Sequence, residues 1–161
     1  MKSYYRVEAY NIDKGTTTAG FVSAVSAMLA HMLGVNPDIP DEQMAVLVAN
    51  TADQDVKTVS GLMGILLQGV DYPEVYLSDK KNHYCFFTQD DFSSKAFFFE
   101  ELAYYVENFY TNIRLMYCMI EFSPEEIVYE DEHQIVVTKD SYETHQPTVY
   151  YEFDTDDNDS Y

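Results

Sequence analysis

The sequence has no tryptophan, only two cysteines, and only nine lysines and arginines among 161 residues. With so few bases, the clustered cations that bind phosphates are missing, so binding to bare nucleic acid or to an anionic membrane is disfavoured. Cys85 and Cys118 lack CxxC spacing and lie in apolar segments, which predicts two reduced core thiols. No run approaches 18 apolar residues, and the N-terminus lacks the apolar core of a signal peptide, so we expect a cytoplasmic protein.

The residue patterns of catalytic and metal sites are also absent. The four histidines do not have metal-ligand spacing with one another or with a cysteine. No arrangement of Ser, His or Cys suggests a catalytic triad, and the pairs Glu100-Glu101 and Glu125-Glu126 are typical of solvated surfaces. We therefore expect no metal, no cofactor and no enzymatic activity.

Acidic residues are in large excess. The chain holds 28 of them, and its formal net charge is −19. A magnitude of about 2 to 8 suffices for the solubility of a small domain, so the excess either serves another purpose or reflects a salty or acidic setting. Residues 121–161 contain 13 of the acids and a single base, Lys139, and this segment alone carries −12.

The acidic segment is threaded through runs that predict strands. β-branched and aromatic residues fill positions 127–129, 135–138 and 149–153. On a strand, residues i and i+2 lie on one face about 6.6 to 6.8 Å apart. We therefore expect rows of carboxylates on a sheet surface among tyrosines, with Glu152 beside Asp154, Asp140 beside Tyr142, and Glu126 in line with Glu130.

Upstream of this segment the hydrophobic pattern predicts both strands and helices. Strands are expected at 4–10, 75–77, 83–88 and 113–122, with the second and third forming a hairpin. Helices are expected at 21–33, after an N-cap in Thr16–Thr18, and at 41–48. A third helix is expected at 56–67, after a cap at Asp53 or Asp55. A fourth is expected to end at Phe109, after a cap at Asp90, Asp91 or Ser93. We predict one α+β domain over residues 1–161, with an antiparallel sheet of the C-terminal strands, helices packed on one face, and residues 121–161 as its acidic β portion.

A surface of this kind is expected to bind a basic protein surface. Fixed carboxylates with neighbouring tyrosines offer a basic cleft the anions and flat faces that a nucleic-acid strand offers. The residues expected to contact the partner are Glu126, Glu130, Asp131, Glu132, Asp140, Glu143, Tyr150, Glu152, Asp154, Asp156 and Asp157.

In its size, its charge and its tyrosine-rich acidic composition, densest after Glu121, the chain resembles the small DNA-mimic inhibitors of phages and mobile elements. These include anti-CRISPR and antirestriction proteins. The resemblance is one of composition over the whole chain. It implies a non-catalytic protein that blocks the basic DNA or RNA channel of a nucleic-acid-binding enzyme, such as a nuclease or a CRISPR effector.

A second class accounts for the same charge. Secretion chaperones and toxin-immunity proteins are also small acidic α+β proteins, and they bind one cognate partner through apolar patches. The run Phe97–Phe99, which we assign to the core, would then lie at an interface, and Gly61 and Gly64 would let another helix approach closely. Such chaperones are commonly dimers, so this class would imply a homodimer. An acidic domain without a dedicated partner and an enzyme without a recognisable motif are the remaining alternatives.

Overall fold

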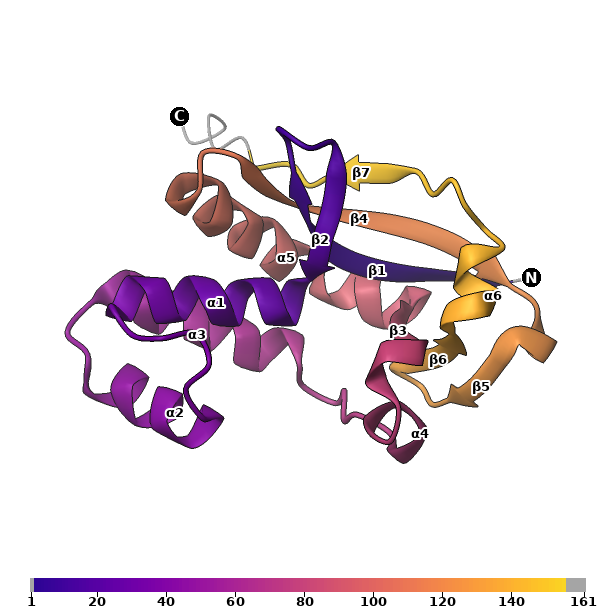
Figure 1. The fold of residues 1–161 in the computed structure, drawn as a ribbon, viewed down its shortest axis with the longest axis horizontal. Helices are drawn as coiled ribbons and strands as arrows, with labels where there is room; N and C mark the ends of the chain where they lie inside the picture. The colour runs from indigo at the N-terminus through magenta and orange to yellow at the C-terminus, as the bar shows by residue number, and fades with distance from the viewer. Residues whose placement is uncertain (1, 156–161) are drawn as a thin grey trace.

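An antiparallel sheet runs through the middle of the computed structural model, which describes residues 2–155 (Figure 1). Six strands lie in the order β5-β6-β3-β1-β4-β7, and β2 pairs with β1 outside this path. All pairs are antiparallel, which confirms the predicted α+β class. The strands of the described residues are β1 (Lys2–Asn11), β2 (Thr16–Gly20), β3 (His83–Thr88), β4 (Ile113–Phe122), β5 (Ile127–Glu130), β6 (Gln134–Thr138) and β7 (Tyr150–Glu152).

The first strand lies inside this sheet, which corrects the prediction that the sheet consists of the C-terminal strands. β1 pairs with β4 along its whole length, from Lys2 opposite Phe122 to Asn11 opposite Ile113. β6 pairs with β3 and β5 pairs with the outer side of β6, whereas β7 pairs with the far side of β4. The strands after Glu121 therefore lie at both edges of one sheet and do not form a separate β portion.

The longer helices agree with the hydrophobic spacing. They are α1 (Phe21–Leu33), α2 (Asp41–Asn50), α3 (Gln54–Leu66) and α5 (Gln89–Phe109), with the shorter α4 (Glu74–Leu77) and α6 (Lys139–Glu143). α1 ends at Gly34, whose φ is 73°, as a glycine C-terminal stop predicts. The side chain of Asp53 caps α3 by accepting from the N–H groups of Asp55 and Val56.

Some predicted boundaries are wrong for identifiable reasons. Thr16–Thr18 does not cap α1 but belongs to β2, because Gly15, with φ 69°, turns the chain into a hairpin with β1. Residues 75–77 form α4 rather than a strand, since β3 already pairs with β6 on one side and β1 on the other. α5 begins after Thr88, whose hydroxyl accepts from the N–H of Asp91, so none of the predicted acidic or serine caps is used.

Apolar side chains pack on both faces of the sheet. Buried residues of α1, α3 and α5 form the larger cluster with one face of β1 and β4, represented by Val7 and Leu115. Alternate residues of the same strands, such as Tyr4 and Ile120, form a second cluster with Tyr142 of α6 on the other face. The prediction of helices on one face therefore holds for the long helices, while α6 covers part of the opposite face.

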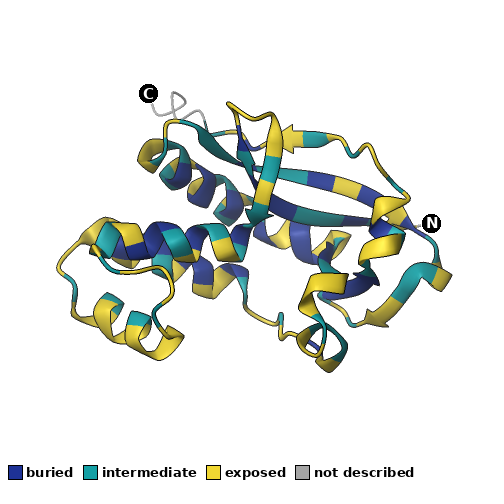
Figure 2. Cartoon of the chain, viewed as in Figure 1, coloured by how far each residue is buried: buried dark blue, intermediate teal, exposed yellow. Residues whose placement is uncertain are grey.

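α2 has no buried residue, and all of its side chains are exposed or half-buried (Figure 2). Cys118 is buried and Cys85 is half-buried, and both are free thiols, as predicted. Among residues 2–155, no helix combines the length and the apolar character needed to cross a membrane.

Candidate functional site

The turn between β5 and β6 is where the structure brings acidic side chains together. Asp131 shapes this turn, because its Oδ1 accepts hydrogen bonds from the backbone N–H groups of His133 at 2.8 Å and Gln134 at 3.0 Å. The Tyr129 hydroxyl donates to Oδ2 at 2.9 Å, and the Asp131 N–H donates to the Gln134 carbonyl at 2.9 Å. Asp131, predicted as a partner-binding residue, is thus also the residue that forms the turn.

These hydrogen bonds set the protonation of Asp131. Partial burial by itself would raise the pKa of its carboxyl group. The bonds from the His133 N–H, the Tyr129 hydroxyl and the Gln134 N–H outweigh that effect, so the pKa lies below its ordinary value. The Asp131 carboxylate therefore stays ionised at neutral pH, and the turn keeps its geometry.

A buried cluster fastens this turn to the first turn of α5. The two oxygens of Asp91 face two basic side chains, with Lys95 Nζ 2.7 Å from Oδ2 and His133 Nδ1 2.8 Å from Oδ1. Lys95 Nζ also donates to the Gln68 carbonyl at 3.0 Å. Asp91 and Lys95 are both buried, and buried charges are tolerated when they are paired in this way.

Thr88 and Gly69 also contact the turn between β5 and β6. The Thr88 hydroxyl donates to the Glu132 carbonyl at 3.0 Å, and the Thr88 N–H donates to the His133 carbonyl at 3.0 Å. Gly69 lies directly against the His133 ring, since a Cβ at this glycine would stand 2.7 Å from His133 Nε2. The turn therefore contacts both the start of α5 and the segment after α3.

The hydrogen bond to Asp91 raises the pKa of His133 above its ordinary value. Burial acts in the opposite direction, and the negative charges of Asp91 and Glu132 reinforce the increase. Protonated His133 is thus favoured at the turn, where it completes the pairing of the buried Asp91 carboxylate.

Above this cluster, Asp90, Glu130, Asp131 and Glu132 line a groove whose lining includes one base, Lys2. We call these four acids and their surroundings the carboxylate groove. Asp90, Glu130 and Glu132 are exposed, and the Glu132 side chain is 85% accessible. The local residue pattern indicates Asp90 only as a helix cap, because the pairing of β3 with β6 that carries it to the turn depends on a distant segment. Its position two residues after the end of a predicted strand is the signal that could have suggested it.

Three of the other predicted residues lie away from the groove. Glu126 belongs to a 3₁₀ turn, η2 (Pro124–Glu126), and its Oε2 is 3.1 Å from His145 Nε2. Asp140 and Glu143 are exposed residues of α6. The expected rows Glu126 with Glu130 and Asp140 with Tyr142 are therefore wrong, since one member or both lie in helical turns rather than on a strand.

The remaining predicted residues lie at the opposite edge of the sheet. Tyr150 of β7 points inward, and its hydroxyl donates to Glu8 Oε1 at 2.7 Å. Glu152 is exposed and forms an ion pair with Arg114, and Asp154 follows just after the strand. Five strand spacings, about 24 Å, separate β7 from β5, so the two acidic runs do not form one surface. Asp156 and Asp157 lie outside the described residues.

Basic side chains do little to neutralise the exposed acids. Arg6 pairs with Glu8 on the sheet and Lys95 pairs with the buried Asp91, while Arg114 pairs with Glu152. The other six bases are exposed lysines, namely Lys2, Lys14, Lys57, Lys80, Lys81 and Lys139. Because each of the first two pairs is neutral as a unit, the net charge of −19 is carried by the rest of the chain.

The chemistry available at the groove is that of fixed anions. Residues 2–155 contain no group of three or more His, Cys, Asp or Glu side chains placed to hold a metal ion. The fold and the site define an acidic α+β protein with a preformed groove of carboxylates. In comparisons with protein-family models, curated proteins and solved structures, the chain matches none of them.

Proposed function

We propose that this chain is a non-catalytic inhibitor that binds the basic nucleic-acid-binding surface of a partner protein. The partner is a nuclease or CRISPR effector, and the inhibitor blocks its access to DNA or RNA by charge mimicry. The observation that carries the proposal is the carboxylate groove, which four acids from two segments line together with one lysine.

The rigidity of the turn favours this function. A channel that binds nucleic acid presents Lys and Arg to phosphates, and carboxylates at fixed positions can take the place of those phosphates. The hydrogen bonds of Asp131 and the contact of His133 with Asp91 order the turn before binding, so less conformational entropy is lost on association. The net charge of −19 also speeds encounter with a basic surface.

The test begins with capture of a partner from bacterial lysate on the immobilised protein. The captured protein should be a nucleic-acid-binding enzyme that is released by high salt and by competing duplex DNA. Retention of the partner in the presence of both would contradict charge mimicry.

A pair of matched variants then locates the binding surface. In the first, Asp90→Asn, Glu130→Gln and Glu132→Gln neutralise the groove while Asp131 is kept to form the turn. In the second, Asp38→Asn, Asp41→Asn and Glu42→Gln remove as many charges around the start of α2. We expect the groove variant to bind the captured partner at least about tenfold more weakly and with a flatter salt dependence, and the control to bind nearly as the natural chain does. Equal losses in the two variants would assign binding to net charge rather than to the groove.

One observation favours the chaperone or immunity class as a second candidate. Phe97 is 61% exposed, although we predicted it in the core, whereas Phe99 two residues later is fully buried. A Cβ at Gly61 or Gly64 would meet nothing within 4 Å, so this face of α3 is open to a partner. If this class is correct, Phe97→Ser will abolish capture while the groove variant binds normally.

A further inference from the structure

Three tyrosines and a methionine form a partly exposed patch on the face of the sheet that α5 covers. Along this face of β4, Tyr117 is half-buried, whereas Met119 and Glu121 are exposed. The neighbouring strands add Tyr5 of β1, which lies opposite Met119, and Tyr151 of β7, which lies opposite Tyr117. We call Tyr5, Tyr117, Met119 and Tyr151 the tyrosine face.

Contacts among these side chains hold the rings in place. Phe92 of α5 stacks on Tyr5, with 4.4 Å between the ring centroids and 3° between the ring planes. The Tyr5 hydroxyl donates to Met119 Sδ at 3.3 Å, and the rings of Tyr117 and Tyr151 lie 5.5 Å apart. Tyr151 is nevertheless 44% exposed and Met119 is 45% exposed. The tyrosine face therefore presents supported, flat, apolar groups to solvent.

Carboxylates lie beside the tyrosine face. Glu121 follows Met119 on the same side of β4, about 6.6 Å further along the strand. Burial raises the pKa of Tyr117, and the charges of the neighbouring tyrosines and of Glu100 on α5 add to the increase. Burial also raises the pKa of Glu100, as does the nearby charge of Asp154. Both ends of the tyrosine face thus carry negative charge.

The tyrosine face is continuous with the carboxylate groove. Ser3 lines the groove, and it lies opposite Glu121 in the pairing of β1 with β4. Two residues further along β1, the same pairing sets Tyr5 opposite Met119. A partner that reaches the groove therefore extends onto the tyrosine face by crossing a single pair of residues.

Flat rings beside carboxylates select a guanidinium group. This group is planar, stacks on aromatic rings and donates two parallel hydrogen bonds to one carboxylate, whereas the ammonium group of lysine is a strongly hydrated point charge. The fold already contains this arrangement, because Arg6 lies 4.8 Å from the ring centroid of Tyr84 and pairs with Glu8. The net charge of −19 opposes binding of a nucleic acid or of a second copy of the chain.

We infer that the tyrosine face binds arginine side chains of the partner protein. One guanidinium group stacks on Tyr151 and donates to Glu100, and another covers Met119 and donates to Glu121. The inference rests on the proposed function for the identity of the partner, which is the basic protein that the carboxylate groove binds. It extends the binding surface from the groove across β1 and β4 to β7, and it requires arginine rather than lysine at these positions.

The first test needs no partner and uses two capped peptides of equal length and charge, one of alternating glycine and arginine and one of alternating glycine and lysine. Each is titrated into the natural chain at physiological ionic strength and followed by two-dimensional NMR. The arginine peptide should shift the resonances of Tyr117, Met119 and Tyr151 in a saturable manner and bind at least about threefold more tightly than the lysine peptide. Equal affinities, or shifts that avoid these residues, would overturn the inference.

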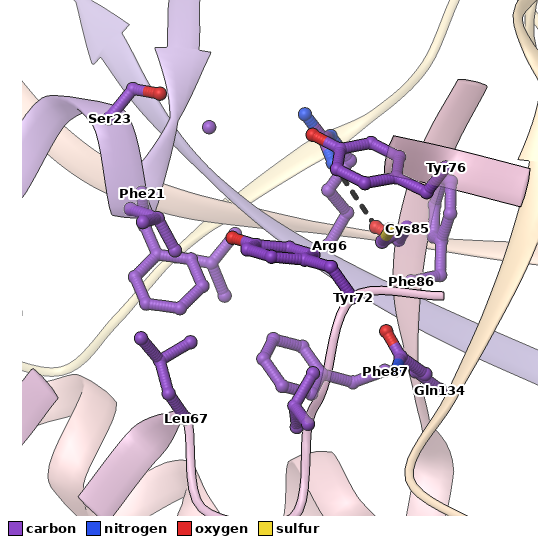
Figure 3. A pocket seen from close by; sticks show the side chains of 14 residues that line it. Arg6, Phe21, Ser23, Leu67, Tyr72, Tyr76, Cys85, Phe86, Phe87 and Gln134 are labelled. Atoms are coloured by element: carbon purple, nitrogen blue, oxygen red, sulfur yellow. Dashed lines mark hydrogen bonds between the residues drawn. The ribbon is translucent and has the colours of Figure 1, made fainter. Parts of the chain in front are cut away.

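A matched pair of variants tests the role of the ring. Tyr151→Leu keeps an apolar side chain but removes the ring. Tyr72 is 40% exposed and its ring stacks on Tyr76 with 5.1 Å between the centroids, so Tyr72→Leu makes the same change in a similar tyrosine pair. Arg6 lies beside this control pair (Figure 3), and its charge opposes a second guanidinium group there. Tyr151→Leu should reduce the affinity for the arginine peptide to that for the lysine peptide, and Tyr72→Leu should leave both affinities unchanged.

The captured partner separates this inference from the proposed function. If both are correct, Tyr151→Leu weakens its binding at least about threefold, the groove variant also weakens it, and Tyr72→Leu does not. Loss of binding in the groove variant but not in Tyr151→Leu would overturn the inference and leave charge mimicry intact, and the reverse would contradict binding at the groove. Resonances of the tyrosine face that shift with protein concentration alone would assign this face to a second copy of the chain and would also overturn the inference.

Discussion

Gly69 meets two requirements that a side chain at its position would violate. Its φ is 81°, in the left-handed region, and a Cβ would stand 2.7 Å from His133 Nε2. Gly34, at the end of α1, has a φ of 73° but would meet nothing within 4 Å. Both positions therefore need the left-handed backbone of glycine, but only Gly69 also needs the absence of a side chain.

We predict that Gly34→Ala lowers the free energy of unfolding by about 1 kcal/mol, which is the cost of left-handed backbone for alanine. Gly69→Ala should cost at least about 1 kcal/mol more, because it also displaces His133 from the buried Asp91 carboxylate. Urea unfolding of the two variants measures the difference. Replacing His133 by alanine in the Gly69→Ala background should recover part of the loss, and equal costs for the two glycines would refute the close-approach argument.

The His133 contact should also make stability depend on pH. Because the pKa of His133 is raised in the folded state, its contribution is fully present below the unfolded-state pKa of about 6.5 and is lost as pH rises through the folded-state value. The difference in unfolding free energy between the natural chain and His133→Gln should therefore be largest near pH 6 and shrink toward pH 9. Asp131, whose pKa is lowered, stays ionised from pH 6 to pH 9 and does not contribute to this difference. A difference that stays constant over this range would mean that His133 acts through packing alone.

At the scale of elements, the short edge strand β7 depends on a contact with the middle of the sheet. It pairs with β4 over three residues, and the hydroxyl of Tyr150 reaches the buried Glu8. The Tyr142 hydroxyl of α6 lies 3.0 Å from that of Tyr150, so one acid of β1 connects to two C-terminal elements. An edge strand this short needs such support.

Tyr150→Phe should therefore destabilise the protein by about 1 to 3 kcal/mol, since one oxygen of a buried carboxylate loses its donor. Tyr151 is the matched control, because it is exposed and its ring packs against Tyr117 on the other face. Tyr151→Phe should change the unfolding free energy by less than about 0.5 kcal/mol. Equilibrium unfolding in urea distinguishes the two, and similar losses would show that Glu8 does not need the Tyr150 hydroxyl.

The local hydrophobic pattern predicted the helices and strands better than it predicted which strands pair with one another. The spacing of Phe21, Val25, Met28 and Leu29 defines α1 because a helix buries one face whatever it packs against. Strand pairing is a property of distant segments, so nothing in β4 indicates that it pairs with the first strand. The same limit explains α4, where Val75–Leu77 has strand composition but finds no free edge on β3.

The candidate site was predictable to the same extent. Glu130, Asp131 and Glu132 fall at a hairpin turn, which the β-branched runs on either side indicate. Asp90 joins them through the pairing of β3 with β6, and Glu152 is carried to the other edge by the pairing of β7 with β4. The positions of Asp90 and Glu152 both depend on the order of the strands, which cannot be predicted from the composition of the acidic segment.

At the scale of the whole molecule, the distribution of bases makes the surface more uniformly acidic than the composition suggests. Among residues 2–155, three Lys or Arg side chains form ion pairs with Asp or Glu, and two of them, Arg6 and Lys95, pair with buried acids. The exposed acids thus repel one another, and the six exposed lysines compensate little of their charge. Self-repulsion of this kind destabilises the compact state.

Salt should therefore act in opposite directions on the free protein and on its proposed complex. The screening length falls from about 30 Å at 0.01 M to about 10 Å at 0.1 M salt, so raising NaCl over this range should increase the unfolding free energy by on the order of 1 kcal/mol. The same increase should weaken binding to a basic partner, because the attraction that it screens is the one that forms the complex. Urea unfolding and binding titrations in the same series of NaCl concentrations measure both slopes. Chloride is the suitable anion, since sulfate also strengthens apolar burial. A stability that falls with NaCl would mean that ion pairs outweigh repulsion on this surface, and binding that is insensitive to NaCl would favour the apolar contact through Phe97.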